Sequence, residues 1–275
     1  MGKFLVYAGE QSYGAEEIAA CLGILTSMSG EASCLLAHIG IKGEGAEQGF
    51  HFPRRMDNRL EPHFSEEGMD ALFRLSESGK LTRDNLMNYT LPILRGRLDL
   101  ASGHERSSRQ NLSAKERIYR QIWRTAAMQY DRIIVQGSEW TIQQSGPEPQ
   151  DTSIVVLRQN KGILERFYNR YSLTDQTWRR QCLIALYPYD EASVLSTKNV
   201  KRIFGGGVQV VGIPHSTDFS NAWNTGEVLS FLLRNKSSIK KSQINYSFMN
   251  ALRQLIDCCN VYDKASKFKD QEEVV

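Results

Sequence analysis

The sequence has few of the features that mark several large classes of protein. Its 275 residues include 7 prolines and 5 cysteines. So few prolines exclude a Pro-rich linker or collagen, and an odd number of cysteines excludes a complete set of intrachain disulfides. No apolar run reaches the roughly 18 residues of a membrane-spanning helix. Lysine and arginine number 34 against 31 aspartate and glutamate, and so small an excess requires neither nucleic acid nor membrane as a partner.

The remaining composition is that of a globular protein, with 41% hydrophobic and 24% charged residues. Residues 1–3 lead directly into the apolar run Phe4–Tyr7, which is too short for the core of a secretory signal. No Cys-x2-Cys or His-x3-His pair occurs, so we expect no metal site. These features predict a cytoplasmic protein with reduced cysteines.

Short apolar runs alternate with segments of helical periodicity along the whole chain. Strand-like runs lie at residues 4–7, 34–39, 132–135, 153–157, 182–186 and 208–213. Helical spacing is found at residues 15–28, 66–95, 115–129, 163–171, 197–204 and 246–259. Such alternation predicts an α/β fold, with a mostly parallel, twisted sheet and helices on both faces. We expect one domain over residues 1–262 and a charged, disordered tail over 263–275.

Several motifs in a fixed order resemble the MinD/ParA family of deviant P-loop ATPases, which belong to the SIMIBI class. The matching segments are Gly96–Gly103, Tyr130–Val135, Tyr189–Val200, Val211–Ser216 and Phe219–Gly226. In segment lengths the chain is most similar to the pilus and flagellar localisation proteins, the TadZ/CpaE-like and FlhG-like branch. The resemblance implies a P-loop fold, a Mg-ATP site after the first strand, and dimerisation across that site.

The residues that bind nucleotide in that family are replaced here. A P-loop needs glycines whose N–H groups approach phosphate, a lysine for the β/γ-phosphates, and a hydroxyl for Mg²⁺. The corresponding turn reads Glu10-Gln11-Ser12-Tyr13-Gly14-Ala15-Glu16-Glu17. By this alignment Gly14 is retained, Glu10 and Ala15 replace the two lysines, and Glu16 replaces the hydroxyl. The alignment therefore predicts a degenerate pocket that includes Ser12 as well.

Three other positions depart from the family pattern. His38 stands at the end of the second strand in place of Asp-x-Asp, and Gln136 stands in place of the Walker B aspartate. Tyr187 replaces the adenine-facing asparagine, although Pro214 remains. Gln136 carries no charge for Mg²⁺. We therefore predict no catalytic residues and neither ATP nor Mg²⁺ as a cofactor, and we expect His38 to be structural.

Two groups of charges permit a functional and a simpler interpretation. Glu10, Glu16 and Glu17 could hold a cation together, but acids are favoured at a helix start by the helix dipole, so a solvated helix start is expected. Within a basic stretch at residues 95–124, one helix face carries three arginines at i, i+3 and i+7 with a tryptophan beside them. This candidate surface for nucleic acid or a partner comprises Arg117, Arg120, Arg124 and Trp123. A solvated face with one core aromatic is the simpler interpretation, and we favour it.

The sequence thus predicts a non-catalytic, MinD/ParA-like pseudo-ATPase. Its expected role is that of a scaffold, localisation or regulatory subunit of a bacterial envelope machine, such as a pilus, flagellum or secretion system. Its expected partner is a protein: a second copy, an active ATPase paralogue or another component. The tail lacks an apolar face, so a partner rather than direct insertion would bring it to the inner face of the membrane. Two alternatives stay open: a divergent ATPase with a remodelled pocket, and a DNA-binding partition-type protein that uses Arg95–Arg124.

Overall fold

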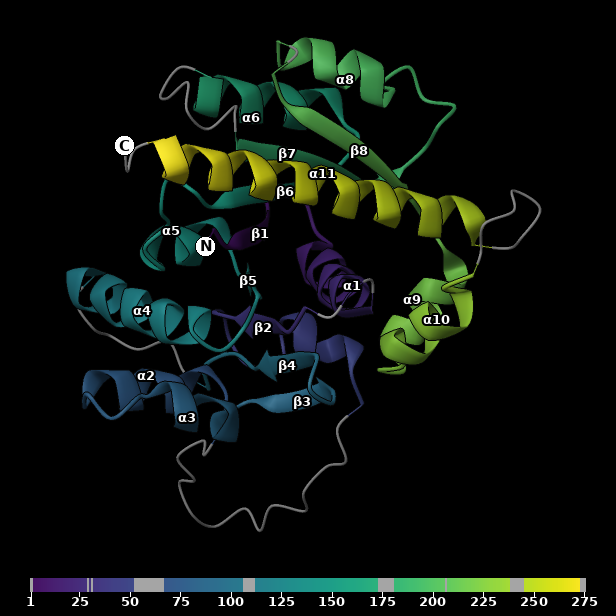
Figure 1. Cartoon of the computed structure of the whole chain (residues 1–275). Helices are drawn as coiled ribbons and strands as arrows, with labels where there is room; N and C mark the ends of the chain where they lie inside the picture. Colours follow the sequence, from purple (N-terminus) through teal and green to yellow (C-terminus); the bar gives the residue numbers. More distant parts are fainter. Residues whose placement is uncertain are drawn as a thin grey trace.

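Figure 1 shows the computed structural model, which describes residues 2–28, 30, 32–51, 67–105, 112–172, 181–205, 207–237 and 245–272. Within these ranges one eight-stranded sheet has the order β3-β4-β2-β5-β1-β6-β7-β8. The strands are β1 Phe4–Ala8, β2 Cys34–His38, β3 Leu91–Leu94, β4 Leu98–Ala101, β5 Arg132–Gln136, β6 Thr152–Leu157, β7 Cys182–Tyr189 and β8 Gln209–Pro214. Neighbouring strands are parallel, except that β3 runs antiparallel to β4.

The strands are apolar on both faces because both faces of the sheet are covered by helices. In β1, for example, Phe4 and Val6 pack into one hydrophobic core, whereas Leu5 and Tyr7 pack into the other. The first core includes α1 Ala15–Met28, α9 Thr217–Asn224, α10 Val228–Asn235 and α11 Tyr246–Glu272. The second core includes α2 Met69–Glu77, α3 Arg83–Leu86, α4 Leu112–Ala127, α5 Glu139–Gln144, α6 Lys161–Ser172 and α8 Thr197–Ile203.

Two short 3₁₀ helices complete the described elements: η1 Ala46–Gly49 and η2 Met87–Tyr89. The long helix α11, yellow in Figure 1, runs along the sheet and contacts β6, β7 and β8. The five cysteines are free thiols, and all but Cys258 are buried. Among the described residues, no helix combines the length and apolar character that crossing a bilayer requires.

The predicted fold class is confirmed, and two element predictions need correction. Residues 66–95 were expected to carry one or two helices, with Leu94 among the helical positions, but Leu91–Leu94 forms β3. Pro92 lacks an N–H donor, which an edge strand tolerates, and Gly96 turns the chain back towards β4 with a φ of 71°. The last helix was expected to end near Cys259, but α11 ends at Glu272. Residues 273–275 lie outside the described residues, and the domain limit at residue 262 stays a prediction.

Candidate functional site

Most of the predicted pocket residues follow or end strands at one edge of the sheet, where the parallel strands have their carboxyl ends, and Tyr187 lies two residues before the end of β7. Open α/β sheets bind ligands at this edge. The residues of the β1–α1 turn, Gly9–Gly14, follow β1. His38 ends β2, Gln136 ends β5 and Pro214 ends β8.

The β1–α1 turn has an unusual backbone and is tied to the end of β6. Glu10 and Gln11 have φ values of 51° and 52°, and Gly14 has a φ of 93°. The first two are left-handed conformations that non-glycine residues adopt infrequently. The Ser12 N–H donates to the Gly9 carbonyl at 3.1 Å. The Ser12 hydroxyl accepts a hydrogen bond from the backbone N–H of Arg158 at 3.0 Å.

Glu10 forms ion pairs with two arginines of α6. Its side chain is only 6% exposed, with Oε1 lying 2.8 Å from Nη2 of Arg170 and Oε2 lying 3.3 Å from Nε of Arg166. Arg170 also reaches Oε2 of Glu139, at the start of α5, through Nη1 at 3.3 Å. The expectation of a solvated acidic helix start is therefore wrong for Glu10, whose carboxylate is held by arginines from another helix.

The ring of Tyr187 lies against the backbone of the turn. A Cβ atom placed on Gly14 would be 2.5 Å from Cδ1 of Tyr187. The Tyr187 hydroxyl is hydrogen-bonded to Glu17 in the first turn of α1. Burial raises the pKa of Glu17; the bond to Tyr187 opposes this shift, and the neighbouring Glu16 adds to it. Ala15 is buried, so an aromatic ring, an acid and a methyl group surround the one retained glycine.

His38 and Gln136 are brought together as register partners on β2 and β5. Gln136 Oε1 accepts a hydrogen bond from the Ala46 N–H at 3.2 Å. His38 Nδ1 lies 2.9 Å from Oε1 of Glu47, which also accepts from the Gly43 N–H at 2.7 Å. Burial acts to raise the pKa of Glu47, but the hydrogen bond and charge of His38 outweigh burial, and the pKa is lowered. Sequence analysis missed Glu47.

Three glycines pack tightly around the His38 imidazole. A Cβ atom would lie 2.5 Å from Nε2 if placed on Gly40, 2.3 Å from Cγ if placed on Gly45, and 2.6 Å from Nδ1 if placed on Gly103. The imidazole is thus enclosed by backbone from the loop after β2 and from the segment after β4. This enclosure fits a structural histidine better than a catalytic one.

Pro214 lies apart from the turn. Pro214 lies on the edge strand β8, three places from β1 in the sheet, and pairs with Tyr189 of β7. Ser216 follows and caps α9, its side-chain oxygen accepting from the Phe219 N–H at 3.2 Å. Across the described part of the chain, no three His, Cys, Asp or Glu side chains are grouped to hold a metal ion.

The predicted arginine surface on α4 is present, but its tryptophan is not part of it. Arg117, Arg120 and Arg124 are exposed and line a hollow of about 380 Å³. Arg120 pairs with Glu116 at 2.7 Å. Trp123 is only 4% exposed, and its indole N–H donates to a backbone carbonyl of residue 145 at 2.9 Å. Trp123 is therefore the core aromatic of the simpler interpretation and not an anchor for a partner. Residues 106–111 of the basic stretch lie outside the described residues.

An Asp–His–Tyr chain joins α2, the segment after β4 and α4. Nδ1 of His104 lies 2.7 Å from Oδ1 of Asp70, and Nε2 lies 2.8 Å from the Tyr119 hydroxyl. Burial opposes ionisation of Asp70, but bonds from His104 and the Glu105 N–H lower its pKa. The three residues are far apart in the sequence, and no spacing signal identifies them.

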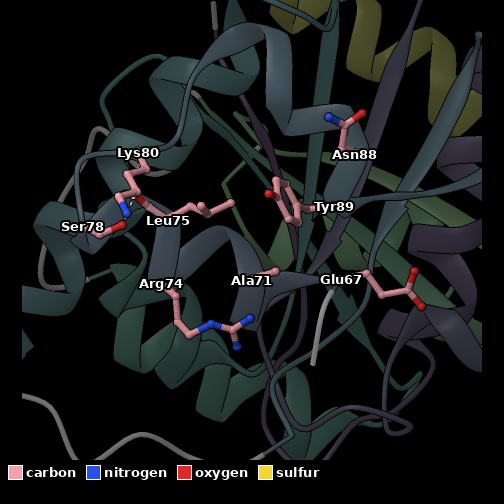
Figure 2. Close-up of a pocket in the computed structure, with 8 residues that line it drawn as sticks. All are labelled: Glu67, Ala71, Arg74, Leu75, Ser78, Lys80, Asn88 and Tyr89. Atoms are coloured by element: carbon pink, nitrogen blue, oxygen red, sulfur yellow. Dashed lines mark hydrogen bonds between the residues drawn. The ribbon is translucent and has the colours of Figure 1, made fainter. Parts of the chain in front are cut away.

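Another hollow, of about 620 Å³, lies beside α2 and η2 (Figure 2). Its lining residues are Glu67, Ala71, Arg74, Leu75, Ser78, Lys80, Asn88 and Tyr89. Figure 2 shows the Tyr89 ring near the middle of this group, between Asn88 and Ala71. No residue of the predicted site lines it.

These features define a three-layer α/β protein in which a strand-to-helix turn occupies the phosphate-binding place of a P-loop protein. Solved structures show the same fold, that of the MinD/ParA ATPases. A ParA family ATPase from Chlorobium tepidum is 15% identical with a TM-score of 0.63, over 93% of this chain and 97% of that one. MinD in a MinC:MinD complex from Aquifex aeolicus is also 15% identical with a TM-score of 0.63, over 94% and 96%.

MinD from Pyrococcus horikoshii, complexed with Mg-ADP, is 12% identical with a TM-score of 0.55, over 95% of this chain and 99% of that one. No protein-family model matches the sequence, and no curated protein matches it significantly. The MinD/ParA-like fold predicted from the ordered motifs is thus confirmed by structure rather than by overall sequence similarity.

Proposed function

We propose that this chain is a pseudo-ATPase that keeps the MinD/ParA-like fold and acts through protein–protein contacts. One observation carries the proposal: the chain's own side chains fill the phosphate-binding turn. The Tyr187 ring packs on Gly14, where a Cβ atom would be 2.5 Å from it. A P-loop needs that glycine open, because phosphate approaches its backbone N–H.

Electrostatics point the same way. Glu16 and Glu17 lie in the first turn of α1, directly after the β1–α1 turn, and Ala15 stands where the family's lysine would neutralise phosphate. Like charges about 4 Å apart repel by roughly 1–4 kcal/mol at effective dielectric constants between 80 and 20. The charge of Glu10 is balanced by the two arginines of α6 with which it pairs and does not add to this repulsion. Without bound nucleotide there is no nucleotide-driven shift between conformations. The chain would therefore keep one conformation for binding its partner, rather than switch between a nucleotide-bound and a nucleotide-free conformation.

The role that follows is a scaffold, localisation or regulatory subunit of a bacterial envelope machine such as a pilus, flagellum or secretion system. The MinC:MinD complex from Aquifex aeolicus illustrates a protein of this fold assembled with a partner. For this chain the partner would be a second copy, an active ATPase paralogue or a component of the machine. That partner would recruit it from the cytoplasm to the inner face of the membrane. The choice of machine rests on fold analogy and on the segment lengths.

Calorimetric titration of the protein with ATP and with ADP, each with and without Mg²⁺, tests the proposal. We expect no heat of binding at millimolar nucleotide. Micromolar binding would overturn the proposal and favour the divergent ATPase with a remodelled pocket. Saturable Mg-ATP turnover that a substitution at Tyr187 abolished would then establish that enzyme.

DNA binding is the second candidate function, and the exposed arginine face of α4 favours it. A plasmid partition protein from Borrelia burgdorferi, bound to AMPPNP, has a similar fold at 12% identity and a TM-score of 0.53, over 86% of this chain and 99% of that one. Binding of duplex DNA should weaken steeply with salt and be lost when Arg117, Arg120 and Arg124 are replaced by alanine. No binding at low salt would remove this candidate.

A further inference from the structure

Three neighbouring strands are followed by exposed aromatic or arginine side chains. In the order β5-β1-β6, Trp140 follows β5, Tyr13 follows β1 and Arg158 follows β6. Trp140 is 62% exposed and Tyr13 is 49% exposed, and Arg158 is exposed as well. Adjacent strands lie about 4.8 Å apart, so the segments that follow them leave the same edge side by side.

Contacts between these segments hold them together as one surface. The Arg158 guanidinium lies over the Tyr13 ring, 5.3 Å from its centroid. Arg170 links the segment after β1 to the segment after β5. It pairs with Glu10 in the first and with Glu139, which directly precedes Trp140, in the second. We define the arginine–aromatic surface as Tyr13, Trp140, Arg158, Arg166 and Arg170.

The charges in this surface are layered. Glu10 and Glu139 are 6% and 22% exposed, whereas Arg166 and Arg170, which pair with Glu10, are 54% and 55% exposed. The carboxylates therefore lie underneath and the guanidinium groups face solvent. An approaching molecule meets positive charge beside the exposed Tyr13 ring, and the exposed Trp140 follows Glu139, the partner of Arg170, in the chain. Tryptophan, tyrosine and arginine are the residues that most often dominate protein–protein binding energy.

We propose that the arginine–aromatic surface binds an acidic segment of a partner protein, with an apolar residue of that segment packed against Trp140. The inference rests on the proposed function, since it names the surface through which the chain makes protein contacts. An acidic peptide is favoured over nucleic acid because the surface holds only three arginines, two of which already pair with Glu10. So few positive charges suit a short peptide with a few carboxylates. Nucleic-acid binding depends on neutralising many phosphates, whereas an apolar anchor gains from the exposed indole.

Selection from a library of random dodecapeptides displayed on phage tests the inference, with the full chain as bait. Counter-selection against a variant that carries both Trp140→Ala and Arg166→Ala removes peptides that bind elsewhere. We expect the surviving peptides to be rich in aspartate and glutamate around an aromatic or aliphatic residue. Survivors that are neutral or basic, or the absence of any survivor, would overturn the inference.

Fluorescence anisotropy of a labelled survivor then measures each contribution. We expect Trp140→Ala and Arg166→Ala each to weaken binding about tenfold, which corresponds to roughly 1.4 kcal/mol, and added salt to weaken it further. Met128→Ala, at an exposed apolar residue just after α4, and Arg83→Ala, at an exposed arginine on α3, are matched controls. Both should bind as the wild type does. Equal losses in the controls would overturn the inference, as would full binding by the Trp140→Ala variant.

Two other occupants are distinguishable outcomes that would also overturn it. Duplex DNA that competes with the peptide would assign the surface to nucleic acid. A dimer in light scattering that Trp140→Ala converts to monomer would assign it to a second copy. The proposed function is tested separately. Nucleotide binding in calorimetry would overturn the pseudo-ATPase proposal, whether or not acidic peptides bind the arginine–aromatic surface.

Discussion

The carboxyl ends of β1 and β2, which β5 separates in the sheet, are filled in different ways. In the β1–α1 turn, Glu10 is held by arginines whose side chains are half exposed. After β2, the His38–Glu47 pair is buried and glycine backbone encloses the imidazole. Both carboxylates are buried, so the difference lies in their partners: the arginines of Glu10 reach solvent, whereas His38 does not. A pair whose cation stays solvated is expected to contribute close to the 0–1 kcal/mol of exposed ion pairs, whereas breaking a pair with both partners buried costs about 3–5 kcal/mol. The β2 end is therefore expected to be a fixed part of the core. Residues of the β1–α1 turn, in contrast, are expected to be free to take part in binding with little effect on the free energy of unfolding.

Removing Glu47 should have the largest effect. The Glu47→Ala substitution leaves the buried His38 without its carboxylate and the Gly43 N–H without its acceptor, so we expect a loss of about 3–5 kcal/mol in the free energy of unfolding. Urea unfolding measures it, with the exposed Glu44→Ala in the same loop as control. If both variants unfold at the same urea concentration, the buried His38–Glu47 pair contributes no more to stability than a surface residue, and the prediction is wrong.

Tyr187→Phe should have an intermediate effect. The ring still packs on Gly14, but the hydroxyl no longer bonds to the partly buried Glu17, so we expect a loss of about 1–3 kcal/mol. Adding Glu17→Gln to Tyr187→Phe should recover part of that loss, because the unpartnered charge is removed. A double variant as unstable as the single one would contradict this description of the turn.

Acid should weaken the β2 end specifically. The pKa of Glu47 is lowered in the folded state, so its stabilising contribution is present above the ordinary carboxyl pKa of about 4.3 and is lost as the pH falls through the lowered value. Wild-type stability should therefore fall between neutral pH and about pH 3 more than that of Glu47→Gln. Urea midpoints measured across this range would contradict the prediction if the two proteins lost stability in parallel.

Removing the carboxylate charge of Glu10 should have the smallest effect. Glu10→Gln breaks pairs with half-exposed arginines, which solvent screens, so we expect a change of about 0–1 kcal/mol in the free energy of unfolding. The same urea experiment measures it, with Glu165→Gln, which pairs with Lys161 at the surface, as control. A loss as large as that of Glu47→Ala would remove the distinction between the two strand ends.

Much of the fold could be predicted from the sequence, because buried strands and helices leave strong periodic patterns. β3 could not be predicted: its four residues carry a proline and resemble the end of the preceding helical segment. The residues that depart from the P-loop pattern, and on which the proposed function depends, were also visible in the sequence. Their partners were not, since Arg166 lies 156 residues from Glu10 and nothing in its spacing marks the contact.

The spacing of residues along the sequence did not show which way the Trp123 side chain points, so a surface position and a core position both stayed open. Trp123 shares its helix with three exposed arginines, but it stacks on Tyr119 with ring centroids 5.8 Å apart and faces the core. The helical spacing of the arginines identified their common face, and it did not reveal that Trp123 belongs to the opposite one. The Asp70–His104–Tyr119 chain depends on three elements packing together, which no local pattern encodes.

We propose that the chain's own side chains take the place of nucleotide at the β1–α1 turn. Thermal unfolding of the wild-type protein, with and without millimolar Mg-ATP, tests it most directly, because a ligand that binds the folded state raises the unfolding temperature. The account predicts the same midpoint in both conditions. A midpoint that rises by several degrees and increases with nucleotide concentration would contradict it.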